Sequence, residues 1–374
     1  MRKIITSESV NIGHPDKTCD TIADAFLDAA LKNDPNAQMA VECAIKDDLL
    51  MIYGEATTTT KLDYASIASK VLKDIGYDSP FRFVVQVSEQ SPEINKATVQ
   101  KSGSDVVLAA NDQGIVYGYA CNETPEFMPM PIMIAHALMK QYDKFRRAVK
   151  SAGLNLYFPD AKSQVSIEYE NDMPVRIHTI LISVSHDVSL LPAEISKDIA
   201  DNVIKPVLSQ YKDVDKEGCT ILVNPSGAFT VWGSHSDSGC VGRKIIVDTY
   251  GGVGRHGGGA FSSKNATKID RSAAYYARYV AKNIVAKGMA DRAEVSASYA
   301  IGLTHPLKVN IETFGTAKVS EAKIYEYVAK NFDFKPANII KELDLLKPIY
   351  QATACFGHFG RNEFSWEKIK RQVD

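Results

Sequence analysis

The stretch QMAVECAIKDDLLMIYGEAT, residues 38–57, decides the fold class of this 374-residue chain. Apolar and polar residues alternate on both sides of the pair Asp47-Asp48, which is the pattern of two antiparallel strands joined by a tight turn. Residues 58–76 then place apolar side chains at helical spacing and end at Gly76, a residue at which helices often stop. The segment therefore predicts a β-hairpin followed by an amphipathic helix that covers one of its faces.

The same hairpin-plus-helix pattern occurs twice more. One copy starts at Ser163 and turns at Asn171-Asp172, and the other starts at Ala293 and turns near Thr304. The three turns are roughly 125 residues apart, and this even spacing favours an internal repeat over chance similarity. Because the strands are apolar on both faces, we also expect large contacts between sheets, including contacts between subunits.

Composition restricts the function classes. Hydrophobic residues make up 45% and charged residues 24%, as in ordinary soluble proteins, and the net charge of −2 excludes a global attraction to nucleic acid or anionic membranes. The six cysteines form no C-x-x-C pair, so we expect reduced thiols in a cytoplasmic protein and no zinc site. The start MRKIITSESV has no apolar core of a signal peptide, and no stretch is long and apolar enough to span a bilayer.

The run GGVGRHGGGAFSSK, residues 251–264, is the strongest chemical signal. Glycines let backbone N–H groups approach an anion closely. Five cations flank the run: Arg243, Lys244, Arg255, Lys264 and Lys268. A flexible surface loop is the alternative, but this density of cations favours a polyphosphate-binding loop. No helix opens at the G-x-G-x-x-G match and no P-loop motif is present, which excludes both common nucleotide folds.

The segments on either side of this run also carry predictions. CVGRKIIVDTY, residues 240–250, has an apolar centre and predicts a strand. A helix is expected to begin near Asp270, whose carboxylate either caps that helix or faces the anion through a metal ion.

A second helix start gathers charges near the N-terminus. In residues 6–31, Pro15 suits the first position of a helix, which places His14, Asp16 and Lys17 together at its N-terminal end. Beside an imidazole and a cation, Asp16 suits both Mg²⁺ and phosphate. Three aspartates follow at four-residue intervals: Asp20, Asp24 and Asp28. For these three we expect a solvated face or local bonding to backbone N–H groups.

Two further residues are ambiguous from the sequence alone. Asp112 lies in the turn 111–114 before a β segment, where it either caps the turn or serves a site. Lys162 stands just before a strand, where a solvated lysine is the usual case.

Together these motifs resemble the S-adenosylmethionine synthetase (methionine adenosyltransferase) family. The resemblance extends from Thr6 to about Trp366, and GHPDK and GGGAFS-x-K are its most specific motifs. The matching segments are TSESVNIGHPDK (6–17), NDQGIVYGYACNETPEFMPMPI (111–132), PDAKSQV (159–165), GRKIIVDTYGG (242–252), RHGGGAFSSKNATKIDRSAAYYARYVAKNIV (255–285) and CFGHFGR (355–361).

The resemblance implies an α+β fold of three domains related by a pseudo-threefold repeat, each a mixed or antiparallel sheet covered by helices on one face. We place the domains at 3–100, 112–231 and 233–368. It implies the reaction of ATP, L-methionine and water to S-adenosylmethionine, phosphate and diphosphate, with two Mg²⁺ per site and one K⁺ per subunit. It also implies a homo-oligomer, a dimer or a dimer of dimers, with sites shared between subunits and no nucleic-acid or membrane partner.

That chemistry agrees with the residues present. The nucleophile is a thioether sulfur, which carries no proton and needs no general base, and the chain shows no Ser-His-Asp or Cys-His constellation. The difficulty is the departure of triphosphate, which preorganised cations would ease. A non-catalytic regulatory subunit and an ATP-dependent phosphotransferase are the competing interpretations; the intact motifs argue against the first, and the lack of a marked hydroxyl-acceptor site against the second.

The resemblance also implies a role for each matching residue. Five are expected at the polyphosphate as catalytic residues: His14, Lys162, Arg243, Lys264 and Lys268. Six are expected to bind substrate: Glu55 and Lys96 on the methionine side, Phe229 stacked on adenine, Asp237 at the sugar and the methionine amino group, and Asp112 and Lys244. Three are expected as metal ligands: Asp16 and Asp270 for Mg²⁺, and Glu42 for K⁺.

Two positions depart from the family pattern. Lys96 stands where the family has glutamine, so the KM for methionine is expected to differ. In residues 233–239, GSHSDSG replaces GPxGDxG, which gives Asp237 the unusual neighbours His235 and Ser236. The segment 91–110 is expected to form a mobile gate over the site.

Overall fold

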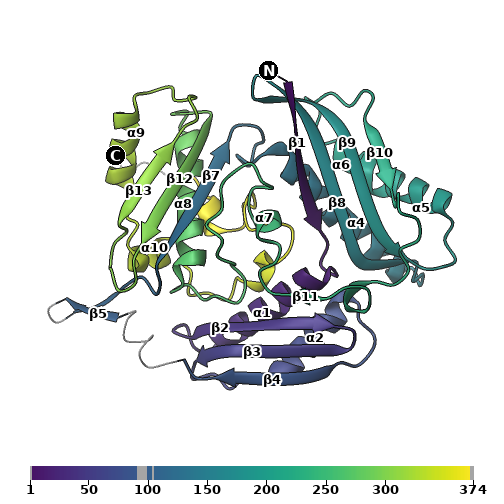
Figure 1. Cartoon of the computed structure of the whole chain (residues 1–374), viewed down its shortest axis with the longest axis horizontal. Coiled ribbons are helices and arrows are strands. Elements are labelled where there is room, and N and C mark those ends of the chain that lie inside the picture. The colour runs from purple at the N-terminus through teal and green to yellow at the C-terminus, as the bar shows by residue number, and fades with distance from the viewer. Residues whose placement is uncertain (1, 91–98, 103–104, 371–374) are drawn as a thin grey trace.

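Three β-sheets, each covered by helices on one face, surround a common centre (Figure 1). The computed structural model describes residues 2–90, 99–102 and 105–370. The arrangement confirms the predicted α+β fold class with its three related sheets, and all three hairpins predicted from the repeat are present.

The first sheet has the order β11-β2-β3-β4, formed by Gly239–Cys240, Gln38–Lys46, Leu49–Thr57 and Arg82–Ser88. Its hairpin turns at Asp47-Asp48, and Asp47 takes the positive φ of 49° that such tight turns require. Helices α1 (Pro15–Leu31) and α2 (Tyr64–Ile75) cover it. Helix α2 begins at Asp63, which accepts from the Ser66 N–H, and ends at Gly76 with φ 129°.

The second sheet has the order β1-β8-β9-β10, formed by Arg2–Val10, Tyr157–Glu170, Met173–His186 and Thr220–Val223. Helix α4 (Met130–Ser151) covers it together with the segment 192–208. The repeat predicts a single helix after this hairpin, but the segment consists of α5 (Pro192–Ile199), a π-helical turn at Ala200–Ile204 and α6 (Lys205–Leu208). The interruption lies next to Pro206, which has no N–H to continue regular α-helical bonding.

The third sheet has the order β7-β12-β13, formed by Gly114–Cys121, Arg292–Tyr299 and Lys308–Glu312. Helices α8 (Ile269–Ala286), α9 (Glu321–Asn331) and α10 (Pro336–Glu342) pack with it around one core. A small hairpin, β5 (Val99–Ser102) with β6 (Asp105–Leu108), precedes β7. The short turns are η2 (Gly233–His235), α7 (Ile245–Asp248), η3 (Gln351–Thr353) and η4 (Ser365–Glu367).

The three units are interlinked because the first strand of each unit pairs with a strand in the sheet of another unit. Strand β1, which leads into α1, pairs with β8 in the second sheet. Strand β7, which leads into α4, pairs with β12 in the third sheet, and β11, which precedes α8, pairs with β2 in the first. The three sheets are therefore joined in a ring, and the segments that follow these strands meet near its centre.

The predicted strand over 240–250 is wrong. Only Gly239–Cys240 is a strand, and Ile245–Asp248 forms the single helical turn α7, in which the Asp248 N–H donates to the Lys244 carbonyl. The apolar run continues no sheet because Gly242, at a φ of 77°, turns the chain away from β2. Asp248 is buried and forms an ion pair with Lys17, so this turn places a charged side chain in the interior.

The expectation of a solvated aspartate face on α1 is also wrong. Asp20 and Asp24 are fully buried and Asp28 is 9% exposed. Each binds a segment distant in sequence: Asp20 accepts from the Gly242 N–H, Asp24 pairs with Arg271, and Asp28 accepts from Tyr350 N–H and Gln351 N–H. Helix α1 lies at the centre of the ring, so the face opposite its apolar stripe meets other segments instead of water.

No helix among the described residues combines the length and the apolar character that a membrane crossing needs.

Candidate active site

The N-terminus of α1 holds an imidazole in its neutral form. His14 is the N-cap residue, and its Nδ1 accepts from the Asp16 N–H at 3.2 Å. Burial, followed by the charge of Lys244, lowers the pKa of His14 to about 3. At neutral pH the ring therefore offers its other nitrogen as a hydrogen-bond donor and carries no charge of its own.

Asp16 lies in the first turn of the same helix, where it accepts two hydrogen bonds and has a second cation nearby. Its Oδ2 accepts from Lys244 Nζ at 2.6 Å, its Oδ1 accepts from the Cys240 N–H at 3.1 Å, and Arg243 Nη1 lies 3.6 Å from Oδ1. Burial alone would raise the pKa of Asp16, but these hydrogen bonds outweigh it and the pKa is lowered. Gly239 allows this approach, because a Cβ there would clash with the Pro15 carbonyl and the Asp16 N–H.

Two exposed charges complete this first group. Lys162 and Asp237 lie close enough for their charges to act on the pKa of His14. Lys162 stands inside β8 opposite Val10, not before the strand as predicted, because β8 begins earlier, at Tyr157. The Asp16 cluster is thus defined by six of the predicted residues: His14, Asp16, Lys162, Asp237, Arg243 and Lys244.

A second group forms where the glycine run meets α8. Lys264 Nζ donates to Asp270 Oδ2 at 2.5 Å, and Asp270 stands in the first turn of the helix, as predicted. It does not cap the helix: Lys268 is the N-cap residue and makes no side-chain cap bond. A Cβ at Gly259 would clash with the Asp270 carboxylate, so the glycine run closes directly over it.

Three further predicted residues surround this pair. Lys268 is 8% exposed; burial lowers its pKa, while the charges of Glu55 and Asp112 act in the opposite direction. Asp112 is exposed and also accepts from the Gln113 N–H at 2.7 Å, so it stabilises its turn while facing Lys268. The Asp270 cluster is defined by five of the predicted residues: Glu55, Asp112, Lys264, Lys268 and Asp270.

Strand β2 separates the two clusters. Its residue Ala40 pairs with Glu55 and bridges to Lys264, whereas Ala44 pairs with Cys240, whose N–H binds Asp16. Four residues of strand span about 13 Å. Glu42 lies between them on the same, helix-free face and accepts from the Tyr53 hydroxyl at 3.4 Å. One chain therefore holds two separate charged groups at the two ends of one open sheet face.

One predicted residue, Phe229, lies elsewhere. Phe229 follows the second sheet, where its N–H donates to His186 Nε2 at the end of β9, at 3.2 Å. Lys96 and half of the predicted gate fall outside the described residues; the part of the gate that is described includes the hairpin β5–β6.

Sequence reasoning missed a buried acid beside the Asp16 cluster. Asp160 accepts from the Gly233 N–H at 3.0 Å, and burial raises its pKa to about 6. Its neighbour Lys162 was the available signal. Arg255, expected among the free cations of the glycine run, instead pairs with Glu294 at 2.7 Å and so anchors the run to β12.

The carboxylates of both clusters fit a hard divalent cation. Asp16 and Asp270 each hold a lysine ammonium at 2.6 and 2.5 Å, so each position already accepts a cation. Among the described residues no three His, Cys, Asp or Glu side chains lie close enough to hold a metal ion by themselves. That composition suits Mg²⁺, which takes one or two protein carboxylates and fills its octahedron with phosphate oxygens and water.

Comparison with known proteins agrees with this geometry. Three family models match the chain: the S-adenosylmethionine synthetase N-terminal domain over residues 2–101, the central domain over 107–229 and the C-terminal domain over 231–368. An S-adenosylmethionine synthase from Clostridium tetani (strain Massachusetts / E88) is 46% identical, with 99% of this chain and 98% of that protein covered.

The protein is a transferase enzyme. The chain belongs to the S-adenosylmethionine synthetase family, whose members use metal ions, and its activity is that of a methionine adenosyltransferase, the synthesis of S-adenosylmethionine.

Proposed function

We propose that synthesis proceeds by attack of the methionine sulfur on C5′ of ATP, with intact triphosphate as the leaving group, followed by hydrolysis of triphosphate to phosphate and diphosphate. The observation that carries this mechanism is the paired lysine–carboxylate arrangement at 2.6 and 2.5 Å in the two clusters. Lysines held in place before substrate arrives stabilise charge developing on the leaving oxygens without reorganisation.

The cations and the imidazole share the polyphosphate. Lys162, Lys264 and Lys268, with Arg243 and Lys244, donate to phosphate oxygens. His14, kept neutral by burial and by Lys244, donates a hydrogen bond near the leaving oxygen without adding a proton that would have to be removed.

Carboxylates and one aromatic ring orient the substrates. Glu55, Asp112 and Asp237 hold the methionine and ribose polar groups, and Phe229 stacks on the adenine. Lys96 contacts the methionine side. We propose Mg²⁺ at Asp16 and Asp270, where it would neutralise phosphate charge, and K⁺ at Glu42 on the open face of the first sheet.

The site is shared between two subunits. A complete polyphosphate site requires both clusters, and within one chain about 13 Å of strand separates them. The face between them is free of helices and exposes apolar side chains, Met51 at 43% and Val84 at 49%. A second copy packed face to face by a twofold axis would bring its Asp270 cluster onto this chain's Asp16 cluster, and the reverse. A dimer, alone or doubled, is therefore the functional unit.

Two further features belong to this proposal. The domains are 3–100, 112–231 and 233–368, and the enzyme is cytoplasmic, in keeping with six free cysteines.

The direct test mixes the protein with ATP, methionine, Mg²⁺ and K⁺ and follows both products. We expect S-adenosylmethionine in equal amount to phosphate and to diphosphate. If ATP labelled in its γ-phosphate releases phosphate before any S-adenosylmethionine forms, the intact-triphosphate mechanism is wrong. If neither S-adenosylmethionine nor phosphate forms, the result would instead favour a non-catalytic regulatory role for this chain.

A further inference from the structure

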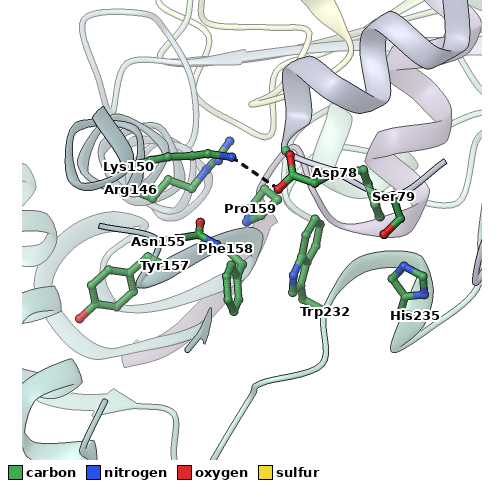
Figure 2. A pocket seen from close by; sticks show the side chains of 12 residues that line it. Asp78, Ser79, Arg146, Lys150, Asn155, Tyr157, Phe158, Pro159, Trp232 and His235 are labelled. Carbon is green, nitrogen blue, oxygen red and sulfur yellow. Dashed lines mark ion pairs between the residues drawn. The ribbon is translucent and has the colours of Figure 1, made fainter. Parts of the chain in front are cut away.

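A cavity of about 220 Å³ lies between the first and second sheets (Figure 2). Its walls come from the residues after α2, the last turns of α4, the start of β8 and the segment that leads to Asp237. None of the predicted site residues lines it. It is therefore a second concave site, separate from the two catalytic clusters.

The floor of the cavity carries an under-compensated buried cation. Arg146 has a side chain only 4% exposed, and its Nε donates to Asp143 Oδ1 at 2.7 Å. The same carboxylate also accepts from Arg147 Nε at 2.7 Å, so two guanidinium groups share one acid. Arg146 Nη2 forms an ion pair with Asp143 Oδ1 at 2.5 Å, whereas Nη1, which has no acceptor among the described residues, lies beside Gly76 in the cavity wall. A guanidinium nitrogen without an acceptor in a concave wall is a position at which an anion can bind.

Two more donors line the same cavity. Lys150, one turn further along α4, is half exposed and lies 3.9 Å from the Asp78 carboxylate (Figure 2). Because Asp78 is 76% exposed, that ion pair is weak and leaves Lys150 available. The indole N–H of Trp232 donates to no acceptor among the described residues. Guanidinium, ammonium and indole N–H groups therefore line one cavity, and the acids paired with them among the described residues are Asp143 and Asp78.

The surrounding rings hold the cavity open. Trp232 stacks on Phe158 at 5.9 Å with planes 20° apart, and Tyr77 packs against its other side at 4.6 Å. Tyr77 is fixed in turn, because its hydroxyl accepts from the Ser234 N–H at 2.9 Å. At Gly76, with φ 129°, no side chain stands between the solvent and Arg146 Nη1. The donors are therefore preorganised and do not collapse onto one another.

We propose that this cavity, the Arg146 pocket, binds the phosphate group of a small molecule. Phosphate is favoured because a guanidinium fork and an ammonium match its several oxygens. The volume exceeds that of the ion alone, so a phosphate monoester of a few carbon atoms fits as well as inorganic phosphate. Asp78 competes for Lys150 and turns outward to solvent when the anion enters.

Tryptophan fluorescence gives a direct measurement. The chain has two tryptophans, and Trp366 is fully buried in the core beside the third sheet. A change in fluorescence on titration therefore reports Trp232. The probes are inorganic phosphate and glycerol phosphate, each titrated into the full-length protein without ATP. Trp232→Phe removes the reporter and should abolish the signal. Tighter binding of glycerol phosphate would identify an ester as the occupant, and equal or tighter binding of phosphate would identify the free ion.

Charge variants separate this pocket from the catalytic clusters, which also bind phosphate. Lys150→Gln should weaken the pocket Kd by about tenfold or more, because it removes a charged hydrogen bond. Lys144→Gln, an exposed lysine of the same helix outside the cavity, should leave the Kd within about twofold. Asp78→Asn should tighten binding, an outcome that a purely structural role would not produce.

Arg146→Gln should abolish the pocket signal, and thermal melting checks that this variant still folds. If Lys150→Gln and Lys144→Gln bind phosphate equally and Asp78→Asn binds no tighter, the pocket is not a phosphate site. A Trp232 fluorescence that responds to neither probe in the unmodified protein would overturn the proposal as well.

Discussion

At the scale of single residues, Lys264 has the clearest role to test. Its ammonium is 22% exposed and paired with Asp270, so it is already positioned before substrate binds. We expect Lys264→Ala to lower kcat by about two to three orders of magnitude, the usual loss when one preorganised donor to a developing anion is removed. Initial rates of S-adenosylmethionine formation measure this effect.

A matched control separates catalysis from folding. Lys323 is an exposed lysine of α9 far from both clusters in sequence, and Lys323→Ala should leave kcat unchanged. The melting temperatures of both variants should stay close to that of the unmodified protein. Unchanged turnover in Lys264→Ala would remove this lysine from the catalytic set.

At the scale of elements, helix α1 joins the first unit to the C-terminal unit through its aspartates. Asp24 accepts two hydrogen bonds from Arg271 of α8, at 2.7 and 2.8 Å, and binds Ser262 and Ser263 as well. Asp24→Ala would leave the buried Arg271 charge unpaired, so we expect the free energy of unfolding to fall by about 3–5 kcal/mol. Urea denaturation measures the change.

The comparison is Asp201, a partly exposed aspartate with two cationic partners. Asp201 pairs with Lys197 at 2.9 Å and with Lys205 at 2.6 Å. Since its side chain is 36% exposed, solvent screens both ion pairs, and Asp201→Ala should lower the free energy of unfolding far less than Asp24→Ala does. Equal losses in the two variants would contradict a central role for α1.

Asp28, at the other end of the same stripe, should give stability a pH dependence. Burial raises its pKa to about 6, although the N–H groups of Gln351 and Tyr350 oppose the shift. The folded state then binds this proton more readily than the unfolded state, so Asp28 adds stability as the pH falls through 6 and loses it as the pH rises. Between pH 8 and pH 5 the native protein should gain about 1–1.5 kcal/mol relative to Asp28→Asn, since one pKa unit is worth about 1.4 kcal/mol. Urea denaturation at both pH values measures this difference, and a constant one would refute the assignment.

The same helix shows how far sequence reasoning reaches. Period-two and period-3.6 patterns predicted the hairpins and their helices, because those patterns depend on neighbours within about ten residues. Whether Asp20 and Asp24 face water or a distant segment depends on how strands of one unit pair with the sheet of another. A local sequence pattern does not contain that information. The strand predicted over 240–250 failed for the same reason: Asp248 is held by Lys17, more than two hundred residues earlier.

For the candidate site, too, local motifs predict part of the arrangement and long-range strand pairing decides the rest. The motifs contain pairs of residues that are close in sequence and also in contact in the structure, such as His14 with Asp16 and Lys264 with Asp270. They could not reveal that the two groups stand apart on one sheet face, because that distance follows from the pairing of β2 with β11 and β3. Asp160 was missed because its burial arises from contact with Gly233 of the last unit.

At the scale of the whole molecule, the separation of the clusters makes a prediction about mixing. Lys244→Ala damages the Asp16 cluster, and Lys264→Ala damages the Asp270 cluster. If each site takes one cluster from each subunit, a mixed dimer of the two variants has one site with both defects and one site with none. Random reassembly of equal amounts gives half mixed dimers, each with one intact site of two, so the mixture should recover about a quarter of the native activity.

Reassembly requires subunit exchange, so the variants are denatured together in urea and refolded, and activity is compared with each variant refolded alone. The double variant on one chain, mixed with the native protein, is the control. In that mixed dimer each shared site carries one defect. The activity of the mixture, relative to native enzyme, should therefore fall below the fraction of native chains in it. If both clusters served one site within a single chain, the first mixture would show only the mean of two inactive enzymes. The open face of the first sheet would then need another explanation for its exposed Met51 and Val84.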